Sequence, residues 1–181
     1  MNLRRPLLWA SLVLLPATAL AAGKAHQHGV LELDIAVEAR RMSLQMASPL
    51  DNLVGFERAP RNDAERKRVD SALAKLKGGQ AMFAVDPAAN CKLAKVDLSS
   101  SVLKLGAAGS GSKGGTADSE HADIDAAFEF DCEDAARAAF VDVLLFEAFP
   151  GMKQINVQVA TGSGQLKRTL KRPARRVLLT R

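Results

Sequence analysis

Apolar and polar residues alternate near both ends of the chain, which is the pattern of strands buried on one face. Residues 30–38 alternate strictly, and residues 42–46 alternate again after a charged reversal, so together they predict an antiparallel hairpin. Residues 155–159 and 166–170 alternate around a Thr-Gly-Ser-Gly turn at 161–164, which predicts a second hairpin. The two ends of the chain are therefore expected to form β-structure.

Further strands are predicted between these hairpins and after them. Residues 82–85 and 91–98 are short strand candidates on either side of a turn at 86–87. Residues 124–132 alternate apolar with mainly acidic side chains and predict a strong strand. Residues 177–179 are expected to add a last edge.

Apolar residues at helical spacing predict two helices. The first begins at Asn62, where Glu65 three residues later completes a capping box, and it ends at Gly78-Gly79. The second extends from Glu133 to Glu147 and is closed by residues 149–151. This order of elements predicts an α+β fold, in which an antiparallel sheet built from the N- and C-terminal hairpins packs with two helices.

The segment 48–57 is too apolar for a solvated loop and too broken for a regular element. Pro49, Asp51, Asn52 and Gly55 favour turns, but apolar residues stand between them. We interpret the segment as a packed corner between a strand and a helix, with the carboxylate of Glu57 at its exit. It either fills the core without any chemistry or shapes a ligand site that Glu57 faces.

The N-terminus has the pattern of an export signal, which we assign to residues 1–21. Arg4 and Arg5 precede an apolar run at residues 7–15 and a small-residue cleavage site at Ala19-Leu20-Ala21. The apolar run is too short to span a bilayer, and no later stretch is long enough. Residues 22–181 are expected to form a single domain, localised to the periplasm after cleavage.

Composition limits the possible partners and predicts one flexible loop. The formal net charge is +5, and loss of Arg4 and Arg5 with the signal leaves +3. This weakly basic balance, together with export, argues against binding to nucleic acid. The stretch from about 106 to 116 holds five of the 13 glycines and is expected to be a flexible Gly/Ser loop.

Two cysteines, Cys91 and Cys132, occur in the chain. An even number of cysteines in an exported protein suggests a disulfide. Two buried free thiols are an alternative. A metal-thiolate pair is a weaker alternative, because the two residues are far apart in the sequence.

The three histidines are the main candidates for metal chemistry. His26 and His28 precede the first strand, and His121 stands beside Glu120 and Asp123. Neutral imidazole and carboxylate groups suit zinc, which usually takes four ligands. No single segment forms a complete site, and two histidines near a processed N-terminus also fit a frayed, solvated tail.

Sequence motifs of catalysis are missing, so we expect the protein not to be an enzyme. The chain has no nucleophile elbow, no His-Glu-x-x-His helix, no phosphate-binding loop and no dinucleotide fingerprint. A basic cluster near the C-terminus either binds an anionic surface or forms a solvated edge strand that blocks aggregation. Its members are Lys167, Arg168, Lys171, Arg172, Arg175 and Arg176.

Several motifs together resemble the ZrgA-like family of exported, zinc-regulated proteins associated with zinc uptake. They are the His26-Gln27-His28-Gly29 opening, Ser48-Pro49, Gly55-Phe56-Glu57, Cys91, His121 and Cys132. The similarity extends from about residue 25 to 170. It implies a periplasmic zinc-binding accessory protein in zinc uptake or homeostasis, which assists an inner-membrane ABC-type zinc importer.

The resemblance also implies a ligand set and a cysteine pair. Cys91 and Cys132 match the pair of the family, and the three histidines match its candidate ligands. We therefore predict one zinc ion where the histidines converge, with a carboxylate as a further ligand. The predicted site residues are His26, His28, His121, Glu57, Glu120 and Asp123.

Two departures from the family pattern indicate a reduced metal capacity. Family members usually carry a run of histidine and aspartate where this chain has the Gly/Ser loop. The usual histidine after Gly-Phe-Glu is Arg58 here. If the metal function is lost, the alternative is a structural or protein-interaction module of the bacterial envelope that binds no metal.

Overall fold

The computed structural model describes residues 27–106 and 122–180. The predicted signal at 1–21, His26, Glu120 and His121 lie outside the described residues. So does the predicted Gly/Ser loop, apart from Gly106 at its start.

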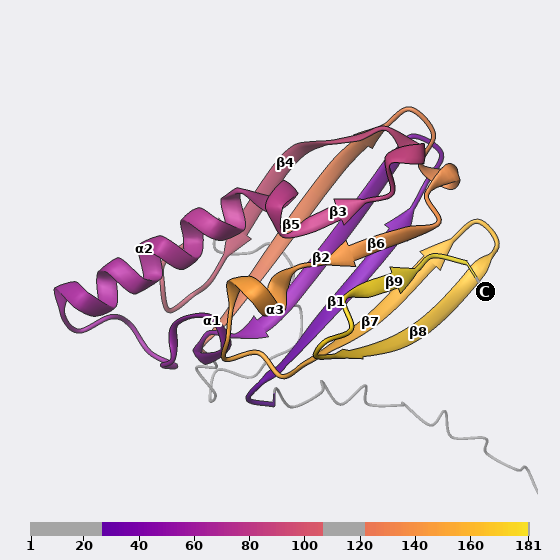
Figure 1. Cartoon of the computed structure of the whole chain (residues 1–181). Coiled ribbons are helices and arrows are strands. Elements are labelled where there is room, and N and C mark those ends of the chain that lie inside the picture. Colours follow the sequence, from indigo (N-terminus) through magenta and orange to yellow (C-terminus); the bar gives the residue numbers. More distant parts are fainter. Residues whose placement is uncertain (1–26, 107–121, 181) are drawn as a thin grey trace, which may run out of the picture.

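A six-stranded sheet forms the body of the fold (Figure 1). The strand order is β4-β5-β2-β1-β7-β8. Its strands are β1 (Val30–Val37), β2 (Arg41–Pro49), β4 (Cys91–Ser99), β5 (Asp123–Cys132), β7 (Gln154–Thr161) and β8 (Gly164–Lys171). Both predicted hairpins are present as β1–β2 and β7–β8, and β5 confirms the strand predicted at 124–132.

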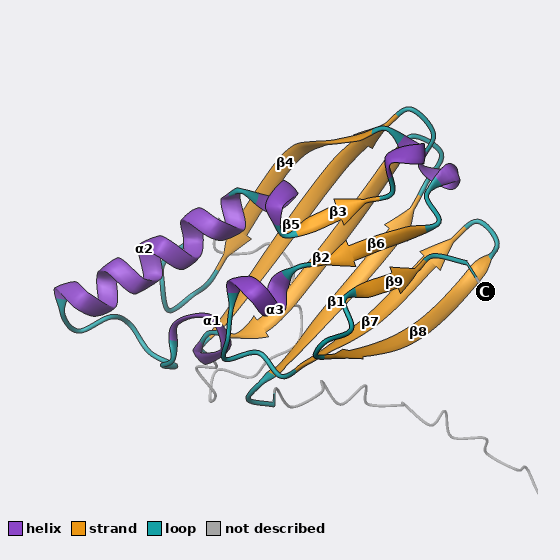
Figure 2. Ribbon diagram, in the orientation of Figure 1, coloured by secondary structure: helices purple, strands orange, loops and turns teal. Residues whose placement is uncertain are grey.

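A second layer covers one face of this sheet. It contains a three-stranded sheet of order β3-β6-β9 together with helices α2 and α3 (Figure 2). These elements are β3 (Phe83–Val85), β6 (Phe140–Val143), β9 (Arg176–Leu178), α2 (Asp63–Lys77) and α3 (Leu145–Ala148). A one-turn helix α1 (Asp51–Val54) and three short 3-10 turns, η1 (Gly79–Ala81), η2 (Pro87–Ala89) and η3 (Ala135–Arg137), complete the fold. The α+β prediction is confirmed.

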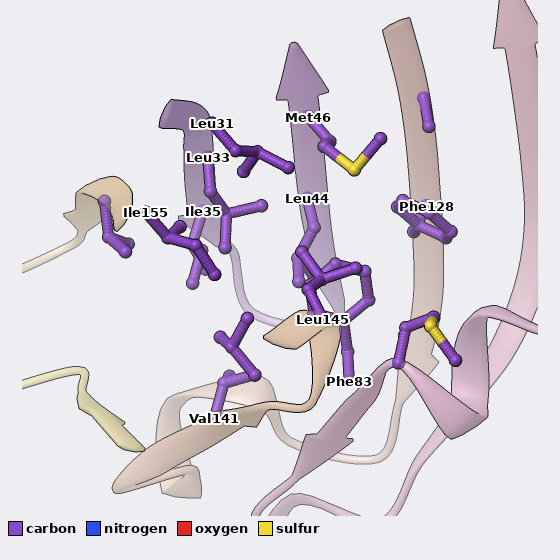
Figure 3. Packing of buried hydrophobic residues seen from close by; sticks show 14 of the residues in the cluster. Leu31, Leu33, Ile35, Leu44, Met46, Phe83, Phe128, Val141, Leu145 and Ile155 are labelled. Carbon is purple, nitrogen blue, oxygen red and sulfur yellow. The ribbon is translucent and has the colours of Figure 1, made fainter. Parts of the chain in front are cut away.

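The core lies between the two layers. Alternate residues of the large sheet, such as Leu33, Leu44 and Phe128, are fully buried and point toward the covering layer (Figure 3). Phe83 of β3 meets the Phe128 ring edge-on, with 4.9 Å between ring centroids. Burial of each such side chain contributes roughly 1.5–3 kcal/mol, so period-2 alternation determines which face of every strand is covered.

Helix α2 begins and ends as its capping signals predict. The Asn62 side chain accepts a hydrogen bond from the Glu65 backbone N–H at 2.9 Å. At the other end, the Gly78 backbone N–H donates to the carbonyls of Ala74 and Lys75. Among the residues that the structure describes, no helix is long and apolar enough to cross a membrane.

The second predicted helix is mostly wrong. Residues 140–143 form strand β6 instead, and only Leu145–Ala148 are α-helical. β6 is the central strand of the small sheet, where it pairs with both β3 and β9 and buries Val141 and Val143. Helical spacing in a short apolar run is ambiguous, and here two neighbouring strands satisfy the backbone of β6.

The cysteines form a disulfide, as predicted. Cys91 at the start of β4 bonds Cys132 at the end of β5, and the two are register partners in adjacent antiparallel strands. The alternatives of free thiols and of a metal-thiolate pair are therefore wrong.

The two terminal hairpins join through a parallel pair. β1 lies beside β7 with Val30 opposite Gln154, whereas the other pairings of the large sheet are antiparallel. The start of β1 therefore lies beside the start of β7. The predicted edge strand at the C-terminus is present as β9, but it pairs with β6 in the small sheet.

Candidate metal centre

The backbone at the start of β1 is fixed on two sides. The Gly29 carbonyl accepts hydrogen bonds from the backbone N–H groups of Lys153 and Gln154, at 2.8 and 2.9 Å. Gly29 has φ +82°, and a Cβ there would lie 2.9 Å from Cδ of Lys153. Glycine is therefore required for this tight entry into the strand, which sets the direction of the preceding His28.

Asn52 of α1 ties this entry to the predicted corner. Its side-chain oxygen accepts from the Gly29 N–H at 2.6 Å. Its amide nitrogen donates to the Val30 carbonyl at 2.9 Å and to Ser48 Oγ at 3.0 Å. Asn52 and Ser48 are buried, so these bonds form in a water-poor environment, where they hold α1 against the start of β1.

The corner is packed, as its apolar residues predict. Leu50 and Val54 are buried, and the Leu50 N–H donates to the Ala122 carbonyl at 2.7 Å. Gly55 ends α1 in the left-handed conformation, with its N–H donating to the Asp51 carbonyl. This turn directs the chain back toward the start of β1 and leads to Glu57.

Three potential ligands meet at this corner. His28 Nδ1 lies 2.5 Å from Asp51 Oδ2, and His28 Nε2 lies 3.6 Å from Glu57 Oε1. One ligand atom from each residue lies within 4.8 Å of the other two. The His28 side chain is 68% exposed, Glu57 39% and Asp51 21%, so the group opens to solvent on the imidazole side.

The two carboxylates favour a positive charge at this point. The hydrogen bond to Asp51, and then the charges of Asp51 and Glu57, raise the pKa of His28 above its ordinary value of 6.5. Desolvation and the nearby Lys153 ammonium oppose this shift. An imidazole between two carboxylates therefore attracts a cation, whether it is a proton or a metal ion.

The donor set fits zinc. Zinc in proteins is bound by histidine nitrogen and carboxylate oxygen, and a ligating histidine commonly donates its other ring N–H to a carboxylate. Asp51 already contacts Nδ1 of His28, while Nε2 faces Glu57. Asp51 Oδ1 is buried and has no hydrogen-bond partner in the described part of the chain, so it has capacity for another partner.

Arg58, which follows the Gly55-Phe56-Glu57 motif, makes a structural contact. Its guanidinium binds both carboxylate oxygens of Glu65, at 2.6 and 2.8 Å. It also lies over the Phe56 ring, 5.0 Å from the centroid. Glu65 additionally accepts from the Arg61 N–H, and these contacts lower its pKa to about 2. Arg58 therefore fastens the corner to α2.

The structure places the predicted site residues as follows. His28 and Glu57 lie in the three-residue group. Asp123 begins β5 opposite Pro49, at the same end of the sheet, but is not part of this group. His26, Glu120 and His121 lie outside the described residues, so their convergence stays a prediction.

Sequence reasoning missed Asp51 as a member of this group, because the residue was interpreted as a turn former. The sequence signal that could have identified Asp51 was its position in the packed corner at 48–57, which also contains Glu57. Asp51 begins the one-turn helix α1, and Glu57 follows Gly55, which ends it. Both carboxylates therefore lie on the same side of the fold.

Comparison with known proteins identifies the family. No curated protein sequence matches the chain. A family model described as "ZrgA family zinc uptake protein" matches residues 25–179, which include nearly all of the described structure and the whole three-residue group. The chain therefore belongs to the ZrgA family of zinc uptake proteins.

Proposed function

We propose that this protein is a periplasmic zinc-binding accessory of zinc uptake, not an enzyme, and that His28 and Glu57 bind the ion while Asp51 orients the imidazole. The observation that carries the proposal is the convergence of one imidazole and two carboxylates from separate segments, with ligand atoms within 4.8 Å of one another. Membership of a zinc uptake family supports zinc as the ion.

The chain's own residues prepare this binding. Asp51 accepts a hydrogen bond from the Nδ1–H group of neutral His28, which leaves the Nε2 lone pair free on the side that Glu57 faces. Glu57 supplies negative charge there, and the buried Asn52 clamp keeps α1 and the His28 segment together. With His28 Nε2 and Glu57 as its direct ligands, a four-coordinate ion keeps open positions.

An open position and an exposed imidazole suit a protein that receives zinc and releases it again. A closed structural site with four protein ligands holds its ion as part of the fold, whereas an open site exchanges a ligand readily. We therefore expect the ion to be cargo, passed on to an inner-membrane ABC-type importer.

The periplasmic assignment is supported by the disulfide and by the N-terminal sequence pattern. Disulfides such as Cys91–Cys132 persist in oxidising compartments, including the bacterial periplasm. Residues 1–21 have the composition of a cleavable signal. Mass spectrometry of periplasmic extract should detect a chain that begins near Ala22.

Calorimetric titration of the mature chain with zinc tests the site. We expect binding of one ion, and a large loss of affinity in His28→Ala and in Glu57→Gln, which keeps the size of the side chain. Glu133→Gln is the matched control, because Glu133 is exposed and follows the far end of β5, roughly 30 Å from the group.

Equal affinities in Glu57→Gln, Glu133→Gln and the unaltered chain would contradict the site. The His26→Ala and His121→Ala variants test the separate prediction that these histidines join it. If they lower affinity as strongly as His28→Ala, the three imidazoles share one ion. If they do not, the described group binds without them.

A further inference from the structure

β8 is a long and regular edge of the large sheet (Figure 1). It pairs with β7 over all eight of its residues, without a shift in register. β4, at the opposite edge, is interrupted by a register shift between Leu93 and Lys95. Within the described chain, β7 is the sole strand partner of β8. A straight unpaired edge is a template for another strand.

The groups that face outward along this edge follow from the hairpin geometry. Thr161 and Gly164 close a two-residue turn, so hydrogen-bonded and non-hydrogen-bonded pairs alternate from that point. Gln165, Lys167 and Thr169 consequently direct their N–H and C=O groups away from β7. Consistent with this, the Lys167 carbonyl accepts a hydrogen bond from the Arg168 guanidinium at the exposed edge.

The charge of this edge is positive and uncompensated. β8 carries three basic residues, Lys167, Arg168 and Lys171, and no aspartate or glutamate. Among the described residues, no ion pair joins Lys167, Arg168 or Lys171 to a carboxylate. On the opposite edge, by contrast, Lys95 pairs with Asp97 of the same strand at 2.6 Å.

The acidic strand β1 is separated from β8 by β7, which carries amide side chains. Asn156 and Gln158 of β7 donate to Glu32 and Asp34 of β1, and Gln158 is the register partner of Lys167. Two strand spacings, about 9–10 Å, therefore separate the lysines of β8 from these carboxylates. This is roughly one Debye length at physiological ionic strength, so the mutual attraction is largely screened.

Positive charge on an edge also blocks aggregation, since it repels a second copy of the same strand. However, the same charge attracts an acidic strand, and β8 has neither a bulge nor a proline to prevent pairing. We propose that the β8 edge binds an extended acidic segment of a partner protein by strand addition, with backbone hydrogen bonds to its outward-facing groups.

The side chains of β8 define the pattern that this segment needs. Lys167 and Lys171 lie on the outer face of the sheet, which selects acidic residues at alternate positions of the added strand. Leu166 and Leu170 lie on the other face, where Leu170 is buried and Leu166 is half-buried. Apolar residues of the partner would extend this face. The expected partner sequence therefore alternates acidic and apolar residues.

The test uses a short capped peptide in which glutamate alternates with valine, added to the isotopically labelled mature chain in zinc-free buffer. We expect chemical-shift changes along β8 and slower amide exchange at Gln165, Lys167 and Thr169. The double reversal Lys167→Glu/Lys171→Glu should weaken binding by about tenfold or more, whereas Lys95→Glu on β4 should not. A lysine–valine peptide should not bind.

Backbone pairing is tested separately from charge. Thr169→Pro removes an outward-facing N–H and leaves the positive charges, so it should also weaken binding of the acidic peptide by about tenfold. The proposal is overturned if the acidic peptide causes neither chemical-shift changes nor slower amide exchange along β8 of the unaltered chain. So would binding that Thr169→Pro leaves intact, or binding only to phosphatidylglycerol vesicles, which would identify a membrane surface. Amide exchange in the unaltered chain decides the question even if a variant does not fold.

Discussion

Replacement of Asn52 by alanine should lower both the stability of the fold and the zinc affinity of the metal centre. The Asn52 side chain is 3% exposed and makes three hydrogen bonds, to Gly29, Val30 and Ser48. Two of these partners are backbone groups at the entry to β1, directly after His28. Alanine removes all three of these hydrogen bonds.

The expected loss of stability follows from the hydrogen bonds that are removed and from the buried groups that lose a partner. Each hydrogen bond contributes about 0.5–1.5 kcal/mol net, and a buried group that loses its partner costs about 1–3 kcal/mol. Ser48 keeps one bond, to the Pro49 carbonyl, but the Gly29 N–H loses the side chain that it donates to. We therefore expect Asn52→Ala to lower the free energy of unfolding by about 3 kcal/mol.

The effect on zinc binding should be separate and measurable. Residues that orient a metal ligand typically contribute about tenfold to hundredfold in affinity, and Asn52 positions His28 relative to Asp51 through Gly29. Asn52→Asp keeps the oxygen that accepts from Gly29 and loses the two donated bonds. Its second carboxylate oxygen would face the Val30 carbonyl, and burying this charge is costly, so Asn52→Asp should be at least as unstable as Asn52→Ala.

The assay is denaturant unfolding followed by circular dichroism, combined with zinc calorimetry on folded protein. Fluorescence is unsuitable, because the single tryptophan, Trp9, lies in the predicted signal and the chain has no tyrosine. Asn156→Ala is the matched control, since the hydrogen bonds of the Asn156 side chain are all with other side chains and none holds the backbone of another segment. It should cost less than about 1 kcal/mol.

Two results would refute this reasoning. A loss below about 1 kcal/mol in Asn52→Ala would mean that water or a rearranged corner replaces the clamp without penalty. An unchanged zinc affinity in a folded Asn52→Ala protein would mean that the clamp does not position His28. In that case Asn52 stabilises the fold only.

Three further outcomes follow from the disulfide and from two ionised groups. Replacing both Cys91 and Cys132 by alanine should lower the free energy of unfolding by about 4 kcal/mol, because the bond closes a loop across a sequence separation of 41 residues; a loss below about 1 kcal/mol in denaturant unfolding would contradict this. The Glu65 pKa of about 2 lies below its ordinary 4.5, so the stability contributed by the Arg58 pair is fully present above about pH 4.5 and is lost as pH falls through 2. Thermal unfolding of Glu65→Gln should therefore differ from that of the unaltered chain at pH 7 and converge with it near pH 2; a constant difference would contradict the linkage. Because the pKa of His28 is raised above its ordinary 6.5, protons should already compete with zinc for this imidazole at a pH above 6.5. Calorimetry should therefore show that zinc affinity begins to fall above pH 6.5 as the pH is lowered. A decline that begins only below pH 6.5 would count against His28 as a ligand.

Local chemistry was sufficient to predict most elements of the fold. Alternation at 30–38 and 124–132 specifies a buried and an exposed face because successive side chains of a strand point to opposite sides. The ends of α2 follow from Asn62 and Gly78, whose contacts are local to the helix. The disulfide followed from the even cysteine count and the expected export.

Longer-range pairing decided what sequence patterns could not. The spacing of apolar residues at 140–143 predicted a helix, whereas the presence of β3 and β9 on either side selects a strand. The parallel pairing of β1 with β7 likewise joins segments more than a hundred residues apart, and no local signal specifies that choice.

The candidate metal centre shows the same division. His28 and Glu57 stood out in the sequence as an imidazole before a strand and a carboxylate after a packed corner. Asp51 did not, because its role depends on Asn52 bringing α1 against the start of β1. Residue types show which ligands a chain offers, but convergence within a few ångströms depends on hydrogen bonds between distant segments, which form only in the folded protein.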